Sequence, residues 1–103
     1  MSEADEALIS VTVQTILDLK RILGQRKMAL VVPEGSTVHN LLAHMIEKWG
    51  QTLSSSLFEP ETGRLFSYIQ IMVNGRSIGF LNGMETVLED HDEVLILPPA
   101  AGG

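Results

Sequence analysis

The last residues of the chain are its best candidates for chemistry. The sequence ends in Pro98-Pro99-Ala100-Ala101-Gly102-Gly103. Two prolines remove backbone donors and favour an extended course, so this tail cannot add a strand and spans roughly 20 Å when extended. Because glycine has no Cβ, Gly102 and Gly103 fit through a narrow channel of a partner enzyme. We therefore expect the carboxylate of Gly103 to react and residues 98–102 to thread it into a partner; the alternative is an ordinary frayed terminus.

Other reactive groups offer little. His39 and His44 are five positions apart, so they do not share a helix face as metal ligands four apart would, and His91 lies in a distant turn. The acidic run 90–93 lacks the ligand spacing of a calcium loop, and no glycine-rich phosphate-binding motif is present. The chain has no cysteine, which excludes a disulfide and a cysteine nucleophile. We expect no bound metal or cofactor, so that any ATP must be bound by a partner.

Length and composition indicate one domain. The chain has 103 residues, of which 45% are hydrophobic, enough for a single core. We expect one domain over residues 1–103, with an acidic N-terminal extension at 1–7 and a flexible tail at 98–103. The acidic start does not resemble a signal peptide, and no apolar run reaches membrane-spanning length, so we expect a cytoplasmic protein without membrane contact.

The charge is acidic and unevenly distributed. Thirteen acids against seven bases give a formal charge of −6, which argues against nucleic acid as a partner. The clusters are Lys20, Arg21, Arg26 and Lys27 near the start, and Glu85, Glu89, Asp90, Asp92 and Glu93 before the tail. Each cluster can be explained as a solvated loop. The alternative for the acidic cluster is that it steers the tail toward a basic docking site.

Hydrophobic periodicity predicts the first elements. Apolar and polar residues alternate over 9–14, and Met28, Leu30 and Val32 repeat the spacing of two, which predicts two strands that form a hairpin. One apolar stripe at helical spacing predicts a helix over 38–49, formed by Val38, Leu41, Leu42, Met45, Ile46 and Trp49. Thr37 is the expected N-cap and Gly50 the expected stop. The acid of a capping box is missing, because Asn40 occupies its place.

The second half of the sequence predicts the remaining strands of the sheet. Residues 51–66 show no sustained period and predict a long connection, in which Leu57 and Phe58 either cover the core or serve a function. A strand over 68–73, an Asn-Gly turn and a short strand over 76–78 follow. The last strand, 94–97, is apolar throughout and should be central. One helix on a mixed sheet of this order is an α+β protein of the β-grasp type.

Several motifs in order resemble one family over nearly the whole chain. They are Val32-Pro33-Glu34-Gly35-Ser36-Thr37-Val38 leading into Leu41-Leu42, Ile71-Met72-Val73-Asn74-Gly75, Leu88-Glu89-Asp90-His91-Asp92-Glu93-Val94, and the tail 98–103. The chain resembles the ubiquitin-like sulfur carriers that include the molybdopterin synthase small subunit and the thiamine-pathway sulfur carrier. It departs from them at His91, where the family usually has glycine. The segments 57–66 and 80–86 look closer to the sulfur carrier of a cysteine-biosynthesis route.

The resemblance implies a function for the C terminus. It implies that an ATP-dependent, E1-like enzyme adenylates Gly103, and that a sulfide or persulfide donor then converts the adenylate to a thiocarboxylate. It also implies a sulfur-accepting synthase, either a molybdopterin synthase large subunit or a cysteine synthase. The chain itself would be a protein co-substrate, or the small subunit of a synthase complex, rather than an enzyme.

Docking residues are expected near the tail. By position in the family, Leu97 faces the partner, and strand alternation places Leu95 and Leu97 on one face and Val94 and Ile96 on the other. Phe80 is the second apolar candidate, with the acids at 92 and 93 as steering charges. Two alternatives stay open: a ubiquitin-like modifier conjugated to lysines through its C terminus, and a β-grasp interaction module without tail chemistry.

Overall fold

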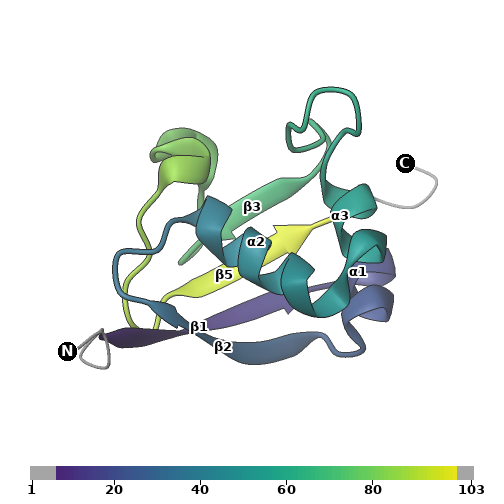
Figure 1. Cartoon of the computed structure of the whole chain (residues 1–103). Coiled ribbons are helices and arrows are strands. Elements are labelled where there is room, and N and C mark those ends of the chain that lie inside the picture. Colours follow the sequence, from purple (N-terminus) through teal and green to yellow (C-terminus); the bar gives the residue numbers. More distant parts are fainter. Residues whose placement is uncertain (1–6, 100–103) are drawn as a thin grey trace.

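The computed structural model describes residues 7–99, which form one mixed sheet with helices packed on one face (Figure 1). The strands are β1 (Leu8–Thr15), β2 (Lys27–Pro33), β3 (Gln70–Val73), β4 (Arg76–Ser77) and β5 (Glu93–Leu97). The helices are α1 (Leu17–Leu23), α2 (Val38–Trp49) and α3 (Gln51–Leu57), with 3₁₀ turns η2 (Ile78–Phe80) and η3 (Gly83–Glu85). The sheet order is β2-β1-β5-β3-β4. β1 and β5 are parallel, and the other neighbours are antiparallel.

The last strand is central, as predicted. β5 lies between β1 and β3, and its side chains alternate between a buried face and an open face. Val94 and Ile96 are buried against the helices, whereas Leu95 and Leu97 are half-buried on the other face. The predicted α+β, ubiquitin-like β-grasp architecture is confirmed by this order and by the main helix on one face.

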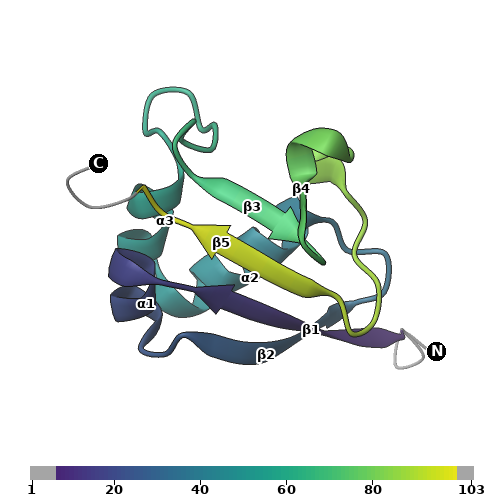
Figure 2. The ribbon, with the colours of Figure 1, turned by 180° about the vertical axis from the view of Figure 1, so that it is seen from behind.

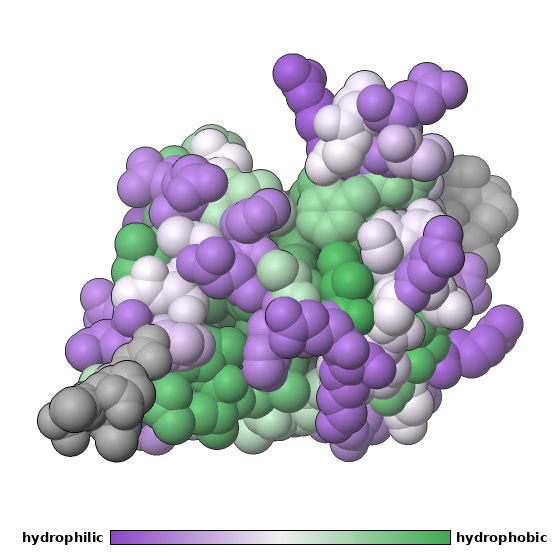
Figure 3. All heavy atoms as spheres, viewed as in Figure 1, coloured by the Kyte–Doolittle hydropathy of each residue, from purple (hydrophilic) through white to green (hydrophobic). Residues whose placement is uncertain are grey.

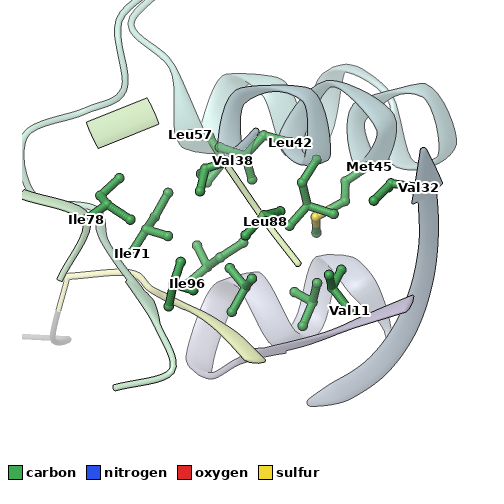
Figure 4. Packing of buried hydrophobic residues seen from close by; sticks show 14 of the residues in the cluster. Val11, Val32, Val38, Leu42, Met45, Leu57, Ile71, Ile78, Leu88 and Ile96 are labelled. Carbon is green, nitrogen blue, oxygen red and sulfur yellow. The ribbon is translucent and has the colours of Figure 1, made fainter. Parts of the chain in front are cut away.

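The main helix supplies much of the core. Leu41, Leu42 and Met45 of α2 have no exposed surface. Leu42 and Met45 point from the helix toward the strands (Figure 4). The Thr37 side chain accepts a hydrogen bond from the backbone N–H of Asn40 (3.2 Å), and Asn40 Oδ1 accepts one from the backbone N–H of Thr37 (2.9 Å). A capping box therefore forms although the usual acid is absent, because the asparagine amide oxygen is an equivalent acceptor.

The long connection predicted over 51–66 is partly wrong, because its first half is helix α3. Gly50 ends α2 with φ 74°, and its carbonyl accepts the N–H groups of Leu53 and Ser54, which starts a helix in a new direction. Leu53 and Leu57 are buried. Since a seven-residue helix shows only one such repeat, its period cannot be read from the sequence. Leu57 covers the core, with Phe58 half-buried beside it.

The hairpin between β1 and β2 is confirmed, but its connection is helix α1 and not a simple loop. Leu19 and Leu23 of α1 are buried, and Gly24 ends the helix with φ 84°. Two of the early basic residues, Lys20 and Arg21, therefore lie on a helix. In the second half, β3 begins at Gln70 and η2 takes up Ile78, which shortens both predicted strands.

The described helices are short, the longest having 12 residues. None of them has the length and apolar composition that crossing a membrane requires.

Candidate functional site at the root of the tail

The central strand leads directly into the predicted reactive tail. β5 ends at Leu97, after which Pro98 is half-buried and Pro99 is exposed. Ala100, Ala101, Gly102 and Gly103 lie outside the described residues. The site that the structure shows is therefore the root of the tail, at one end of the sheet (Figure 2).

A buried hydrogen bond holds the end of β5. The hydroxyl of Thr15, the last residue of β1, donates to the carbonyl oxygen of Ile96 at 2.6 Å. Thr15 is 1% exposed, and the parallel register places it beside Ile96. A satisfied buried hydroxyl in this position keeps the end of β5 on the sheet before the prolines begin.

Replacing Thr15 with valine tests this contact. Thr15→Val keeps the shape but removes the donor, so we expect the free energy of unfolding to fall by about 1–3 kcal/mol, as for other buried groups left unpaired. Urea denaturation followed by circular dichroism measures the change. Thr12→Val is the matched control, because Thr12 is half-buried on the open face of the same strand. Equal losses in both variants would contradict a specific role for the Thr15 hydroxyl.

An apolar centre lies on the open face of the sheet beside the root. Leu95 and Leu97 project there, and Met72 of β3 pairs directly with Leu95. All three are half-buried, and polar residues border them: Gln14 pairs with Leu95 from β1, and Gln70 pairs with Leu97 from β3. No helix covers this part of the sheet in Figure 2. An apolar centre with a polar rim is the form expected of a protein-binding surface.

Helix α1 borders the root on the other side, which sequence reasoning missed. Because β1 and β5 are parallel, α1 begins at the end of the sheet where the tail leaves (Figures 1 and 2). Ile16 and Leu17 are 39% and 47% exposed there, and Leu17 has φ 56°, an unusual backbone conformation for a branched residue. Leu17, Lys20, Arg21 and Gly24 line a shallow hollow. The tail root is thus adjacent to exposed apolar and basic groups.

The acidic turn before β5 is built by its own carboxylates. Asp92 accepts hydrogen bonds from the side-chain amide of Asn74 and the backbone N–H of Glu89, both at 2.8 Å. Asp90 accepts one from the backbone N–H of Ser10 at 2.8 Å. His91 takes φ 71°, the conformation in which glycine is usual. The acidic run therefore stabilises the turn, and the Asp92 carboxylate is occupied by hydrogen bonds within the protein.

The structure separates the predicted docking residues. Glu93 is exposed and shares the open face with Leu97, but it lies at the opposite end of β5, roughly 13 Å away at the usual rise per residue. Phe80 is 84% exposed in η2. The segment after β4 lies at the end of the sheet away from the tail (Figures 1 and 2). Half-buried Leu97 and exposed Phe80 are therefore two separate positions rather than one patch.

The described part of the chain contains no cluster of three His, Asp or Glu side chains that could hold a metal ion. The three histidines are exposed. Within residues 7–99, the one acidic side chain at ion-pair distance from His91 is that of its neighbour Asp90, at 3.2 Å.

A mixed five-stranded sheet, one main helix and a central strand that leads into a Gly-Gly ending define a small ubiquitin-like protein. Comparison with known proteins gives its family. The ThiS family model matches residues 17–103, and the chain belongs to this family.

Named relatives agree with this assignment. The chain is 31% identical to small archaeal modifier protein 3 of Haloferax volcanii over 84 residues, which is 82% of this chain and 88% of that protein. It is 39% identical to a putative sulfur carrier protein of Archaeoglobus fulgidus over 70 residues, 68% of this chain and 77% of that protein.

The fold is also similar to those of solved structures. Small archaeal modifier protein 1 of Methanosarcina acetivorans has a TM-score of 0.79 at 31% identity, covering 94% of this chain and 99% of that one. One chain in a complex of BexX and CysO from Amycolatopsis orientalis matches with a TM-score of 0.72 at 26% identity, covering 90% of this chain and 99% of that one. The chain is thus a member of the ubiquitin-like sulfur-carrier family, whose named relatives are small carrier and modifier proteins and not catalysts.

Proposed function

We propose that the chain carries sulfur as a thiocarboxylate on Gly103, after adenylation of that residue by an E1-like enzyme. The observation that carries the proposal is the family match, which extends to Gly103 and therefore includes the Gly-Gly pair. The similarity to the putative sulfur carrier of Archaeoglobus fulgidus supports sulfur as the group carried.

The chemistry requires activation because a carboxylate is a poor electrophile. In the proposed first step the Gly103 carboxylate attacks the α-phosphorus of ATP, forming an acyl-adenylate and releasing pyrophosphate. Sulfide then attacks the acyl carbon, the bond to AMP breaks, and loss of a proton leaves the thiocarboxylate. If the donor is an enzyme persulfide, its terminal sulfur attacks instead, and a second thiol cleaves the S–S bond to release the thiocarboxylate. ATP and the sulfur donor would both be held by partners.

The body of the protein must supply most of the recognition, because ordering a free tail in an active site costs entropy. We infer that the E1-like enzyme docks on the open face around Leu95 and Leu97. Glu93 on that face, together with Lys20 and Arg21 near the root, would provide charges that orient the encounter. The sulfur acceptor is proposed to be a synthase, either a molybdopterin synthase large subunit or a cysteine synthase.

A second candidate function is conjugation to target lysines through Gly103. It is favoured by the relatives named small archaeal modifier proteins. Both functions use the same activated carboxylate and differ in the nucleophile, which is sulfide in one and a lysine amine in the other. An interaction module that does not use the tail would tolerate loss of Gly102 and Gly103.

Mass spectrometry of the protein from its native cell separates these functions. A sulfur carrier is expected to show an intact mass in which sulfur replaces one oxygen, and alkylation of the thiocarboxylate should label the C terminus. A modifier should instead give branched tryptic peptides. Because trypsin cleaves after lysine and arginine and Arg76 is the last of these, the branch left on a target lysine would be residues 77–103. Absence of the sulfur-containing mass together with such branches would overturn the carrier proposal.

The docking surface is tested by Leu97→Glu. A charge in the apolar centre should weaken binding to the E1-like enzyme by about 1 kcal/mol or more, as loss of an interface anchor typically does. Isothermal titration calorimetry measures the affinity, and a thermal melt shows whether the domain stays folded. Val87→Glu is the control, because Val87 is 55% exposed outside the sheet.

Two outcomes would revise this surface. Unfolding of Leu97→Glu would assign Leu97 to the core, and normal binding by the folded variant would place recognition elsewhere. Phe80→Glu asks whether the exposed ring in η2 forms a second contact. Glu93→Gln tests steering and should mainly lower the association rate; Asp92 is unsuitable for that test because it supports the turn.

A further inference from the structure

One edge of the sheet is long, apolar and unprotected. β2 is the outermost strand, and its central residues 28–32 read Met-Ala-Leu-Val-Val, without a charge. Lys27 and Pro33 stand only at its two ends. Its pairing with β1 runs without a bulge from Leu8–Pro33 to Gln14–Lys27. Proteins normally blunt such an edge with internal charges, proline or a bulge, because an open strand is a template for another strand.

The backbone groups that face outward can be identified from the hydrogen bonds at both ends of the pairing. Thr15 N–H donates to the carbonyl of Arg26, and Glu34 N–H donates to the carbonyl of Ala7, both at 2.9 Å. In an antiparallel ladder every second residue bonds to the neighbouring strand. The even-numbered residues 26–34 therefore face β1, which leaves the N–H and C=O groups of Lys27, Ala29 and Val31 directed outward.

This edge is complementary to itself. When two β2 strands are placed antiparallel about a twofold axis at Leu30, Ala29 of each copy faces Val31 of the other, so that outward groups meet outward groups. Met28 then faces Val32, and Arg26 faces Glu34 of the second copy. Arg26 and Glu34 are exposed, and neither takes part in an ion pair with another residue of 7–99. Over residues 28–32 the register thus pairs apolar with apolar side chains, and Arg26 with Glu34 places opposite charges at both ends.

Apolar surface flanks the edge on both faces. Val31 is 51% exposed and Ala29 is exposed on the open face. On the helix side a hollow of about 440 Å³ lies between β2 and α2, where Val32, Ala43 and Glu47 contribute to its lining. Figure 3 shows hydrophobic atoms gathered along this margin, below α2. In the symmetric register the Met28 side chain of a second copy would lie beside Val32, next to this hollow.

We propose that a second copy of the chain pairs along β2, forming a symmetric dimer with a continuous ten-stranded sheet. β1 separates β2 from β5 by two strand spacings, roughly 10 Å, so both tail roots and both apolar centres stay open. The dimer would present two carrier termini at once, whatever their cargo.

Sedimentation equilibrium of the purified full chain tests the proposal. We expect dimer at high protein concentration and monomer on dilution. Arg26→Glu and Glu34→Arg each place like charges together twice, so each should weaken association by on the order of ten-fold or more. The double variant Arg26→Glu/Glu34→Arg should restore it. Arg64→Glu is the matched control, because it makes the same charge change on an exposed loop away from β2.

A second variant tests the backbone directly. Ala29→Pro removes an outward N–H that the β1 pairing does not use, so the fold should persist by circular dichroism while the dimer is lost. A chain that stays monomeric at millimolar concentration would overturn the proposal and leave the edge to an extended segment of another protein. Charge reversals that associate as well as the parent chain, or a double variant that does not recover, would overturn this register.

Discussion

Removing Gly103 is expected to abolish thiocarboxylate formation while leaving the free energy of unfolding within about 0.5 kcal/mol of the parent chain. Among residues 7–99 the buried core runs from Ile9 to Ile96, and neither Pro98 nor Pro99 belongs to it. The chemistry, by contrast, requires the terminal carboxylate to reach the acyl-activating centre, and a tail one residue shorter falls short of it by about 3.5 Å. Incubation with ATP, the E1-like enzyme and sulfide, followed by intact-mass measurement, gives the yield of product.

A deletion of the same size at the other end, removal of Ser2, is the control and should leave the yield unchanged. Full product from the chain without Gly103 would show that the reactive carboxylate does not depend on this residue. A large fall in melting temperature would show instead that the tail supports the fold.

Leu42→Ala is expected to produce the largest loss of stability, about 2–5 kcal/mol. The Leu42 side chain has no exposed surface and lies in the centre of the α2 stripe against the sheet (Figure 4). Truncation leaves a cavity that its packed neighbours fill only in part. For a domain of this size, each kcal/mol lowers the melting temperature by about 4–8 °C. Urea denaturation gives the free energy, and calorimetry gives the melting temperature.

His39→Ala is the control on the same helix, because His39 is exposed and should change the free energy of unfolding by less than about 0.5 kcal/mol. If Leu42→Ala costs no more than His39→Ala, the core relaxes around the cavity. If it costs no more than deletion of Gly103, the separation between a folded body and a reactive terminus is wrong.

Periodic patterns in the sequence were enough to predict most of the sheet and the main helix. Strand β1 alternates apolar and polar residues, β2 keeps Met28, Leu30 and Val32 at every second position, and α2 repeats its apolar stripe over three turns. Each pattern is therefore long enough to show its period. The short helices α1 and α3 could not be predicted in this way. Each buries only two residues four apart, a spacing too brief to separate from a loop.

Some features of the candidate site could likewise be predicted from the sequence, and others could not. The amino-acid sequence by itself determined the Gly-Gly ending and, through alternation, the face on which Leu97 lies. The sequence also showed the acidic run, but not that the Asp92 carboxylate accepts a hydrogen bond from Asn74, 18 positions away. Whether a carboxylate is free or bound depends on what the fold brings next to it.

Only the tertiary structure decided what surrounds the root of the tail. Thr15 bonds to Ile96 across 81 positions, and α1 lies at the tail root, because β1 and β5 pair in parallel. The same strand order leaves β2 with a free edge and separates Phe80 from Leu97. Local periods show which face of an element is buried, whereas strand order follows from how all the elements together bury one core, and that is a property of the whole chain.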